Sequence, residues 1–211
     1  MLRTKLAALA LLALIIPACG GDRTVDPPLF QDTFSGTFPG TNWSTPATTG
    51  AGTAPTVQIV GGVLEFVGTS DTSTATTTTT TTFGNRSVSF SVQMSAKWAA
   101  GQKGTGTIEI IDGTPTVIAS MSWNPETAMI TYSILGTAAA PIAAPVSNGT
   151  LNHFVFSIDS AGKGTWFLNN GATVTNATAI TATPLRVRLG ATFGTGTWPT
   201  FDFDNVTVTS P

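Results

Sequence analysis

The feature that most constrains this chain is a strict alternation of apolar and polar residues from Val88 to Trp98. In an extended strand, successive side chains point to opposite faces of the sheet, so this alternation places every apolar side chain on one face. The residues between them are Ser, Gln and Lys. The pattern therefore predicts a β-strand with one buried and one solvated face, and it does not fit the 3.6-residue period of a helix.

The same two-residue period recurs along the chain, and Gly, Asn, Asp or Pro turn signals separate the segments. From residue 29 onward we find no amphipathic helix, and Ala138–Ala144 contains Pro141, which would break one. Ten to twelve short strands predict an all-β, antiparallel sandwich. The expected strands are Val57–Val60, Val63–Val67, Val88–Trp98, Thr107–Asp112, Val117–Trp123, Ala128–Leu135, Phe154–Asp159, Thr165–Leu168, Leu185–Phe193 and Phe201–Val208.

Seven consecutive threonines, Thr76–Thr82, allow two interpretations. A low-complexity run of this kind can be a disordered or glycosylated stalk. Threonine is also β-branched and favours strands. Because a stalk at this position would split the domain, we favour a strand.

The amino terminus has the features of an export signal. Arg3 and Lys5 precede the uncharged apolar segment Leu6–Ile16, which is followed by Ala18 and Cys19. The apolar segment is shorter than the roughly 20 residues that span a bilayer. A cysteine directly after the cleavage point resembles the lipobox of bacterial lipoproteins, which implies cleavage before Cys19 and acylation of that residue. The alternative is an ordinary secretory signal cut after Ala18, which would leave a free thiol.

This resemblance divides the chain into three parts. Residues 1–18 are a signal-peptide helix, residues 19–28 are the acylated cysteine with a Gly- and Pro-rich tether, and residues 29–211 are one sandwich domain. The predicted location is the bacterial cell envelope, with the protein bound to the membrane through its lipid. Gly20 follows the cysteine where an inner-membrane protein would have Asp, so we expect the outer membrane or the cell surface.

Charge excludes one class of partner. Only 9% of the residues are charged, and no basic cluster exists. A nucleic-acid partner requires a cationic surface, so we expect none.

Cys19 is the only cysteine, so the fold contains no intramolecular disulfide.

Three passages, taken in order, resemble the concanavalin A-like lectin/glucanase superfamily, including its laminin G-like members. They are Phe30–Phe34 with Asn42-Trp43 and Gly62–Phe66, then His153–Asp159 with Gly164–Gly171, and finally Arg186–Gly190 with Phe203–Val208. The resemblance implies a jelly roll of two curved sheets, with a concave face that binds or cleaves glycans in many members.

The catalytic motif of the related glucanases is not intact. Their Gly-Glu-x-Asp-x-x-Glu strand is most nearly matched by Gly106–Asp112, where Thr107 stands in the position of the nucleophile. Glu109 is then the middle acid, and Asp112 stands in the acid/base position. A retaining mechanism needs two carboxyl groups, so we predict no catalytic residues. The single histidine, His153, is interpreted as a packing or surface residue.

Glycan binding is the main functional hypothesis, and it comes from the resemblance. The candidate ligand-binding residues are Gln93, Glu109, Trp123, Tyr132 and Trp198. The competing interpretation is that each aromatic residue is buried in the core. A concave face of Ser and Thr, without an exposed aromatic or paired carboxylates, would weigh against ligand binding.

The only cofactor that the resemblance suggests is a structural calcium ion at Asp32 and Asp204. Calcium favours carboxylate and carbonyl oxygens. The alternative is that both acids cap turns or accept backbone hydrogen bonds.

The sequence thus predicts a lipid-anchored, non-catalytic domain that binds a glycan or another ligand or acts as a structural surface lipoprotein. A glycoside hydrolase with divergent acids is the alternative.

Overall fold

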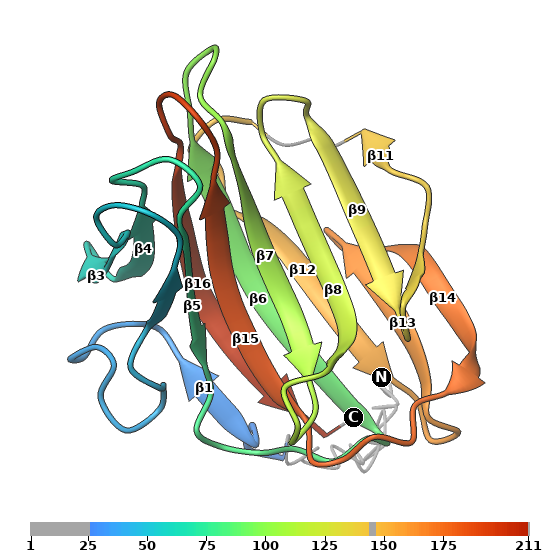
Figure 1. The fold of residues 1–211 in the computed structure, drawn as a ribbon. Helices are drawn as coiled ribbons and strands as arrows, with labels where there is room; N and C mark the ends of the chain where they lie inside the picture. The colour runs from blue at the N-terminus through green and yellow to red at the C-terminus, as the bar shows by residue number, and fades with distance from the viewer. Residues whose placement is uncertain (1–25, 144–146, 211) are drawn as a thin grey trace, which may run out of the picture.

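Two antiparallel sheets stack face to face and enclose the hydrophobic core (Figure 1). The computed structural model describes residues 26–143 and 147–210, and over these residues the chain is all-β, with sixteen strands and no helix. Each sheet has eight strands. The predicted all-β antiparallel sandwich is therefore confirmed.

The rear sheet in Figure 1 contains the strictly alternating strand at its centre. Its order is β14 (Gly171–Ala179), β13 (Lys163–Leu168), β12 (Asn152–Ile158), β6 (Val88–Lys97), β16 (Thr200–Thr209), β4 (Val63–Val67) and β3 (Thr56–Val60), with β1 (Phe30–Asp32) also paired to β16.

The front sheet faces the viewer in Figure 1. Its order is β10 (Thr137–Ala138), β9 (Met129–Ile134), β8 (Val117–Asn124), β7 (Gly104–Ile111), β15 (Arg186–Phe193), β5 (Thr74–Thr78) and β2 (Ala47–Thr49), with β11 (Ile142–Ala143) also paired to β9.

The core consists of the inward-facing side chains of both sheets. Along β6, Val88, Phe90, Val92 and Met94 are buried while the intervening residues are partly exposed, as the alternation predicts. Trp98 lies just beyond the end of β6 and is only partly buried. Alternate side chains of each strand thus point into the core, and each sheet has one buried face.

Gly106 is an inward-facing position of β7 at which the two sheets come unusually close. A Cβ atom at this position would lie 2.6 Å from Cδ1 of Phe201, which belongs to β16 in the opposite sheet. A Cβ does not fit at that distance, so the close approach requires glycine here.

The threonine run forms a strand, as favoured, although the bounds differ. β5 begins at Thr74 and ends at Thr78, and Thr79 then forms an isolated bridge with Trp43. Thr77 and Thr79 are buried, and the Thr77 hydroxyl donates to the Ser44 carbonyl at 2.8 Å. This inward hydrogen bond explains how a threonine run can serve both faces of a strand.

The predicted signal-peptide helix, Cys19 and most of the tether lie outside the described residues. Within the described ranges, the structure contains no helix with the length and apolar character needed to cross a membrane.

Candidate functional site

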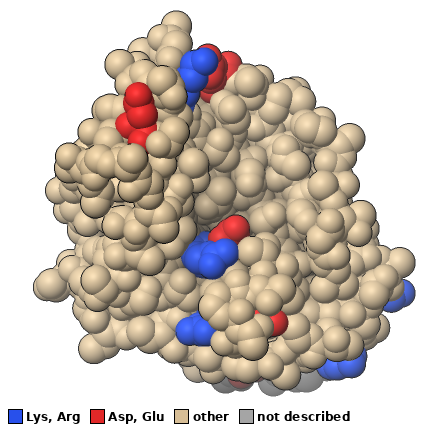
Figure 2. All heavy atoms as spheres, viewed as in Figure 1, with Lys and Arg blue, Asp and Glu red and all other residues tan. Residues whose placement is uncertain are grey.

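The outer face of the front sheet is hollowed and carries few charged groups (Figure 2). Because β5, β15, β7, β8 and β9 are paired in register, their outward side chains form rows across the sheet. Most of these side chains are hydroxyl groups, and none is aromatic. The outward residues are Thr74, Thr76, Thr78, Arg186, Arg188, Gly190, Thr192, Thr105, Thr107, Glu109, Ser120, Ser122, Asn124, Met129, Thr131 and Ser133.

A groove of about 420 Å³ lies on this face, above β7, β8 and β9. Its lining combines hydroxyl and amide groups with two apolar residues. The lining residues are Thr105, Ser122, Asn124, Thr127, Met129, Thr131 and Pro141. Groups of this kind can both donate and accept hydrogen bonds, as a ligand rich in hydroxyl groups requires.

Glu109 and Arg188 form an ion pair near the middle of the same face. They are register partners on β7 and β15, and Arg188 Nε donates to Glu109 Oε2 at 2.5 Å. Their side chains are 18% and 22% exposed, respectively. Glu109 is therefore placed on the hollowed face, but its charge is balanced by an arginine and it faces no second carboxyl group.

Asp112 lies in the turn that follows β7, where it binds its own backbone. Its Oδ1 accepts hydrogen bonds from the backbone N–H groups of Thr114 and Thr116 at 2.8 and 2.9 Å, and from the Thr114 hydroxyl at 2.9 Å. Desolvation raises the pKa of Asp112, but these hydrogen bonds and the charge of Arg186 lower it, and the net shift of the pKa is downward. The acid that matches the acid/base position of the glucanases thus organises a turn.

Two predicted ligand-binding residues are in the core, which corrects the expectation for both. Trp123 and Tyr132 are 0% exposed and point inward from β8 and β9. Trp123 packs edge-on against Trp98, and Tyr132 packs against Trp166 with ring centroids 5.7 Å apart. Burial raises the pKa of Tyr132 to about 12. Neither ring is accessible for stacking on a sugar.

Trp198 and Gln93 are not on the strands of the hollowed face, since Trp198 lies in the loop between β15 and β16 and Gln93 lies on β6. Trp198 is partly buried against the core, and its Nε1 donates to the Gly194 carbonyl at 2.7 Å. Gln93 lies on the outer face of the rear sheet, where its Oε1 accepts a hydrogen bond from Asn205 at 3.0 Å. Of the five predicted ligand-binding residues, the structure therefore places only Glu109 on the hollowed face.

The two acids predicted to bind calcium are each engaged locally. Asp32 accepts hydrogen bonds from the backbone N–H of Phe34 at 2.7 Å and from Asn42 Nδ2 and Trp43 Nε1 at 2.9 Å each. Asp204 accepts from the backbone and the side-chain amide of Asn205 at 2.7 and 3.1 Å. Burial raises the pKa of Asp204. These contacts favour the turn-forming alternative, and the described residues contain no group of three or more His, Cys, Asp or Glu side chains arranged for a metal ion. Of the two alternatives, the contacts support local hydrogen bonding by both acids, and a calcium titration is the test of the metal site.

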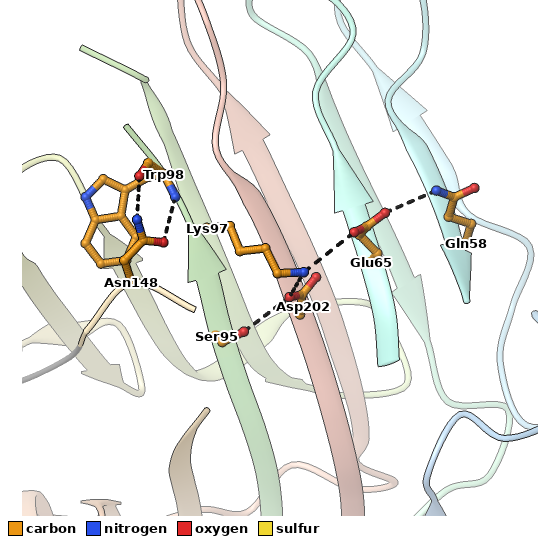
Figure 3. A network of polar contacts seen from close by, with 7 residues as sticks. All are labelled: Gln58, Glu65, Ser95, Lys97, Trp98, Asn148 and Asp202. Carbon is orange, nitrogen blue, oxygen red and sulfur yellow. Dashed lines mark hydrogen bonds and ion pairs between the residues drawn. The ribbon is translucent and has the colours of Figure 1, made fainter. Parts of the chain in front are cut away.

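A polar network crosses the outer face of the rear sheet (Figure 3). Lys97 Nζ lies 2.8 Å from Asp202 Oδ2 and 3.9 Å from Glu65 Oε1. Ser95 donates to Asp202 at 3.3 Å, and Gln58 donates to Glu65 at 3.1 Å. Asp202 and Glu65 are register partners, but the Asp202 side chain is only 4% exposed. A substrate cannot reach this carboxylate, so the network joins strands and does not form a catalytic pair.

His153 is on the same outer face, on β12, and its Nε2 lies 2.6 Å from the Ser91 hydroxyl. Within the part of the chain that the structure describes, no acid forms an ion pair with it. It therefore has no carboxylate to orient it, as a Ser-His-acid triad would require.

No family model matches the chain, and a comparison with curated proteins finds no match. Solved structures share its fold. The carbohydrate recognition domain of Emp47p is 10% identical with a TM-score of 0.64, covering 85% of this chain and 93% of that one. A Bacillus licheniformis β-glucanase is 14% identical with a TM-score of 0.59, covering 86% and 98%. The carbohydrate-binding module CBM66 from Bacillus subtilis is 14% identical with a TM-score of 0.52, covering 81% and 96%. At these identities the likeness establishes the fold, which is the concanavalin A-like jelly-roll sandwich.

Arg186, Arg188 and Asn124 are not among the site residues predicted from the sequence. A signal for them was present, because each is flanked by apolar residues that point inward: Val187 separates the two arginines, and Trp123 precedes Asn124. Alternation alone thus assigns them to the outer face. It does not indicate that this face is hollowed.

Proposed function

We propose that this chain is a lipid-anchored, non-catalytic glycan-binding protein of the bacterial cell envelope. The observation that carries the proposal is the groove on the hollowed outer face of the front sheet, with its hydroxyl and amide lining. A glycan presents hydroxyl groups at regular intervals, and a register-paired array of Thr, Ser and Asn side chains offers complementary donors and acceptors.

Binding at this face relies on hydrogen bonds. The face consists mainly of Ser and Thr and has neither an exposed aromatic nor paired carboxylates, which is the composition expected to weigh against ligand binding. Sugar stacking and hydrolysis therefore have no support here, and the support that remains for a glycan is the groove with its hydroxyl and amide lining. Each neutral hydrogen bond contributes only about 1 kcal/mol after the loss of water, so we expect weak binding to a single sugar and stronger binding to longer chains.

The similar structures support a glycan ligand by analogy. Two of them are named as a carbohydrate recognition domain and a carbohydrate-binding module, and a third is named as a glucanase. The non-catalytic reading rests on this chain's own residues. Thr107 occupies the place of the glucanase nucleophile, and Glu109 is paired with Arg188.

Membrane attachment through Cys19 rests on the sequence of residues 1–19. Mass spectrometry of the mature protein is expected to find acyl chains on Cys19. A Cys19→Ser variant should be released from the membrane while the domain keeps its melting temperature, because no disulfide is lost. An unmodified thiol at the mature amino terminus would contradict the anchor.

The glycan proposal is tested on a glycan array with the soluble domain. We expect binding without release of product. The paired substitution Ser122→Ala with Thr131→Ala removes two hydroxyl groups from the groove and should weaken binding severalfold. As a matched control, Ser89→Ala with Ser157→Ala removes two hydroxyl groups that pair with one another on the rear sheet. Equal binding by both double variants, or no binding to any glycan, would contradict the proposal.

A further inference from the structure

We infer that the glycan bound at this face is acidic, and that Arg186 binds a carboxylate of its uronic-acid units; this rests on the proposed function. The two arginines of β15 differ in whether a carboxylate of the protein balances their charge. Arg188 is neutralised by Glu109, whereas Arg186 has no ion-pair partner within 4.0 Å among residues 26–143 and 147–210. The Nε atom of Arg186 is buried and makes no hydrogen bond.

A guanidinium group has five N–H donors in a planar fork, and it binds a carboxylate through two parallel hydrogen bonds. Buried donors without partners are rare in folded proteins, because each loses its hydrogen bond to water. The Nε of Arg186 is such a donor, and because it is enclosed by the protein a ligand would bind the other guanidinium nitrogens, which are not among the buried unpartnered atoms. An arginine with no ion-pair partner on this face is therefore a position where a carboxylate would gain a favourable interaction.

The charge of Arg186 contributes to lowering the pKa of Asp112, so this acid is close enough to interact with the guanidinium group. Its Oδ1 already accepts three hydrogen bonds from Thr114 and Thr116, and it forms no ion pair with the guanidinium. Asp112 therefore weakens the attraction of Arg186 for an anion, but it forms no ion pair with the guanidinium nitrogens that are not buried.

Arg186 and the groove lie on one continuous face. Arg186 is the register partner of Ile111 at the end of β7, and Thr105, which lines the groove, is near the start of that strand. Six residues of strand correspond to about 20 Å. An extended oligosaccharide of several units spans this distance, so the groove and Arg186 can hold one chain together.

The experiment compares polygalacturonate oligosaccharides with the same oligosaccharides in methyl-ester form, which keeps the sugar and removes the charge. Binding of the soluble domain is measured by calorimetry, alongside an array that contains neutral and uronate-bearing glycans. We expect the acid to bind more tightly than the ester, with an affinity that falls as salt is added.

Arg186→Gln should lower the affinity for the acid about tenfold or more and leave the affinity for the ester unchanged. Lys163→Gln is the matched control, because it removes the same charge from an exposed position on β13 in the other sheet. It should leave both affinities unchanged.

The outcomes separate the two hypotheses. Binding only to neutral glycans, equal binding of acid and ester, or equal losses in the Arg186 and Lys163 variants would overturn the inference while the glycan proposal stands. No binding to any glycan on the array would overturn both.

Discussion

The indole Nε1 of Trp43 donates a hydrogen bond to the Asp32 carboxylate at 2.9 Å. Trp43 is 3% exposed and packs against Phe30 and Phe34, so this bond satisfies a buried donor at the edge of the core. The same carboxylate also holds the backbone N–H of Phe34. One acid thus fixes the segment that leads from β1 into the loop before β2.

Asp32→Ala should lower the free energy of unfolding by about 2–3 kcal/mol, because it leaves the Trp43 and Phe34 donors without a charged acceptor. Urea denaturation followed by tryptophan fluorescence measures this change. Asp26→Ala removes the same charge from an exposed position and is expected to change stability little. Equal stability of the two variants would show that the hydrogen bonds of Asp32 are not stabilising.

Removal of calcium tests the prediction made for Asp32 and Asp204. Because each carboxylate is engaged by neighbouring N–H groups, we expect the melting temperature to be the same in a chelator and in excess calcium. A melting temperature that rises with calcium, and no longer does so in an Asp204→Asn variant, would instead establish a metal site.

The titration of Tyr132 can be followed without interference, because it is the only tyrosine of the chain. Burial raises its pKa to about 12, so phenolate absorbance should appear near pH 12 in the folded protein and near pH 10 in denaturant. The folded state holds the proton more tightly, so stability should decline as the pH rises from 10 toward 12. Phenolate formation near pH 10 in the folded protein would indicate a solvent-exposed ring.

Lys97 balances the charge of the Asp202 carboxylate, which is almost inaccessible to water. Lys97→Gln should lower the free energy of unfolding by about 1–2 kcal/mol, which is less than for a fully buried pair because Lys97 is 58% exposed. The double variant with Asp202→Asn removes the unpaired charge as well, and it should recover part of that loss. Additive effects in this cycle would argue against a direct interaction.

The ion pair of Lys97 also predicts a pH dependence. The hydrogen bond to Asp202 raises the pKa of Lys97 above its usual 10.5. Its contribution is therefore complete below pH 10.5 and is lost as the pH rises through the higher value in the folded state. Lys97→Gln should flatten the part of the alkaline stability profile that is not due to Tyr132.

The strands could be predicted because their alternation is a local property. β6, β8 and β15 all follow a two-residue period that can be counted directly. β14 was not predicted, and its sequence GATVTNATA shows why. Small residues and threonine fit either face of a strand, so the segment has no clear alternation of apolar and polar positions. Its placement depends on pairing with β13.

The site could be predicted much less well. Trp123 and Tyr132 are candidate ligand-binding residues by sequence, but Trp123 shares its strand face with Met121, and Tyr132 shares its face with Ile130 and Ile134. Counting the period would have placed both rings in the core. The Glu109–Arg188 pair, in contrast, depends on β7 and β15 being neighbours in register, which only the folded sheet reveals.

Gly106 links the packing between the sheets to the shape of the outer face. Phe201 of the opposite sheet occupies the space where a side chain at position 106 would lie, directly beneath the strand that carries Thr105. The floor of the groove is therefore set by the thickness of the sandwich behind it. A substitution at a position that does not line the groove, such as Phe201→Leu, is therefore expected to change the shape of the groove.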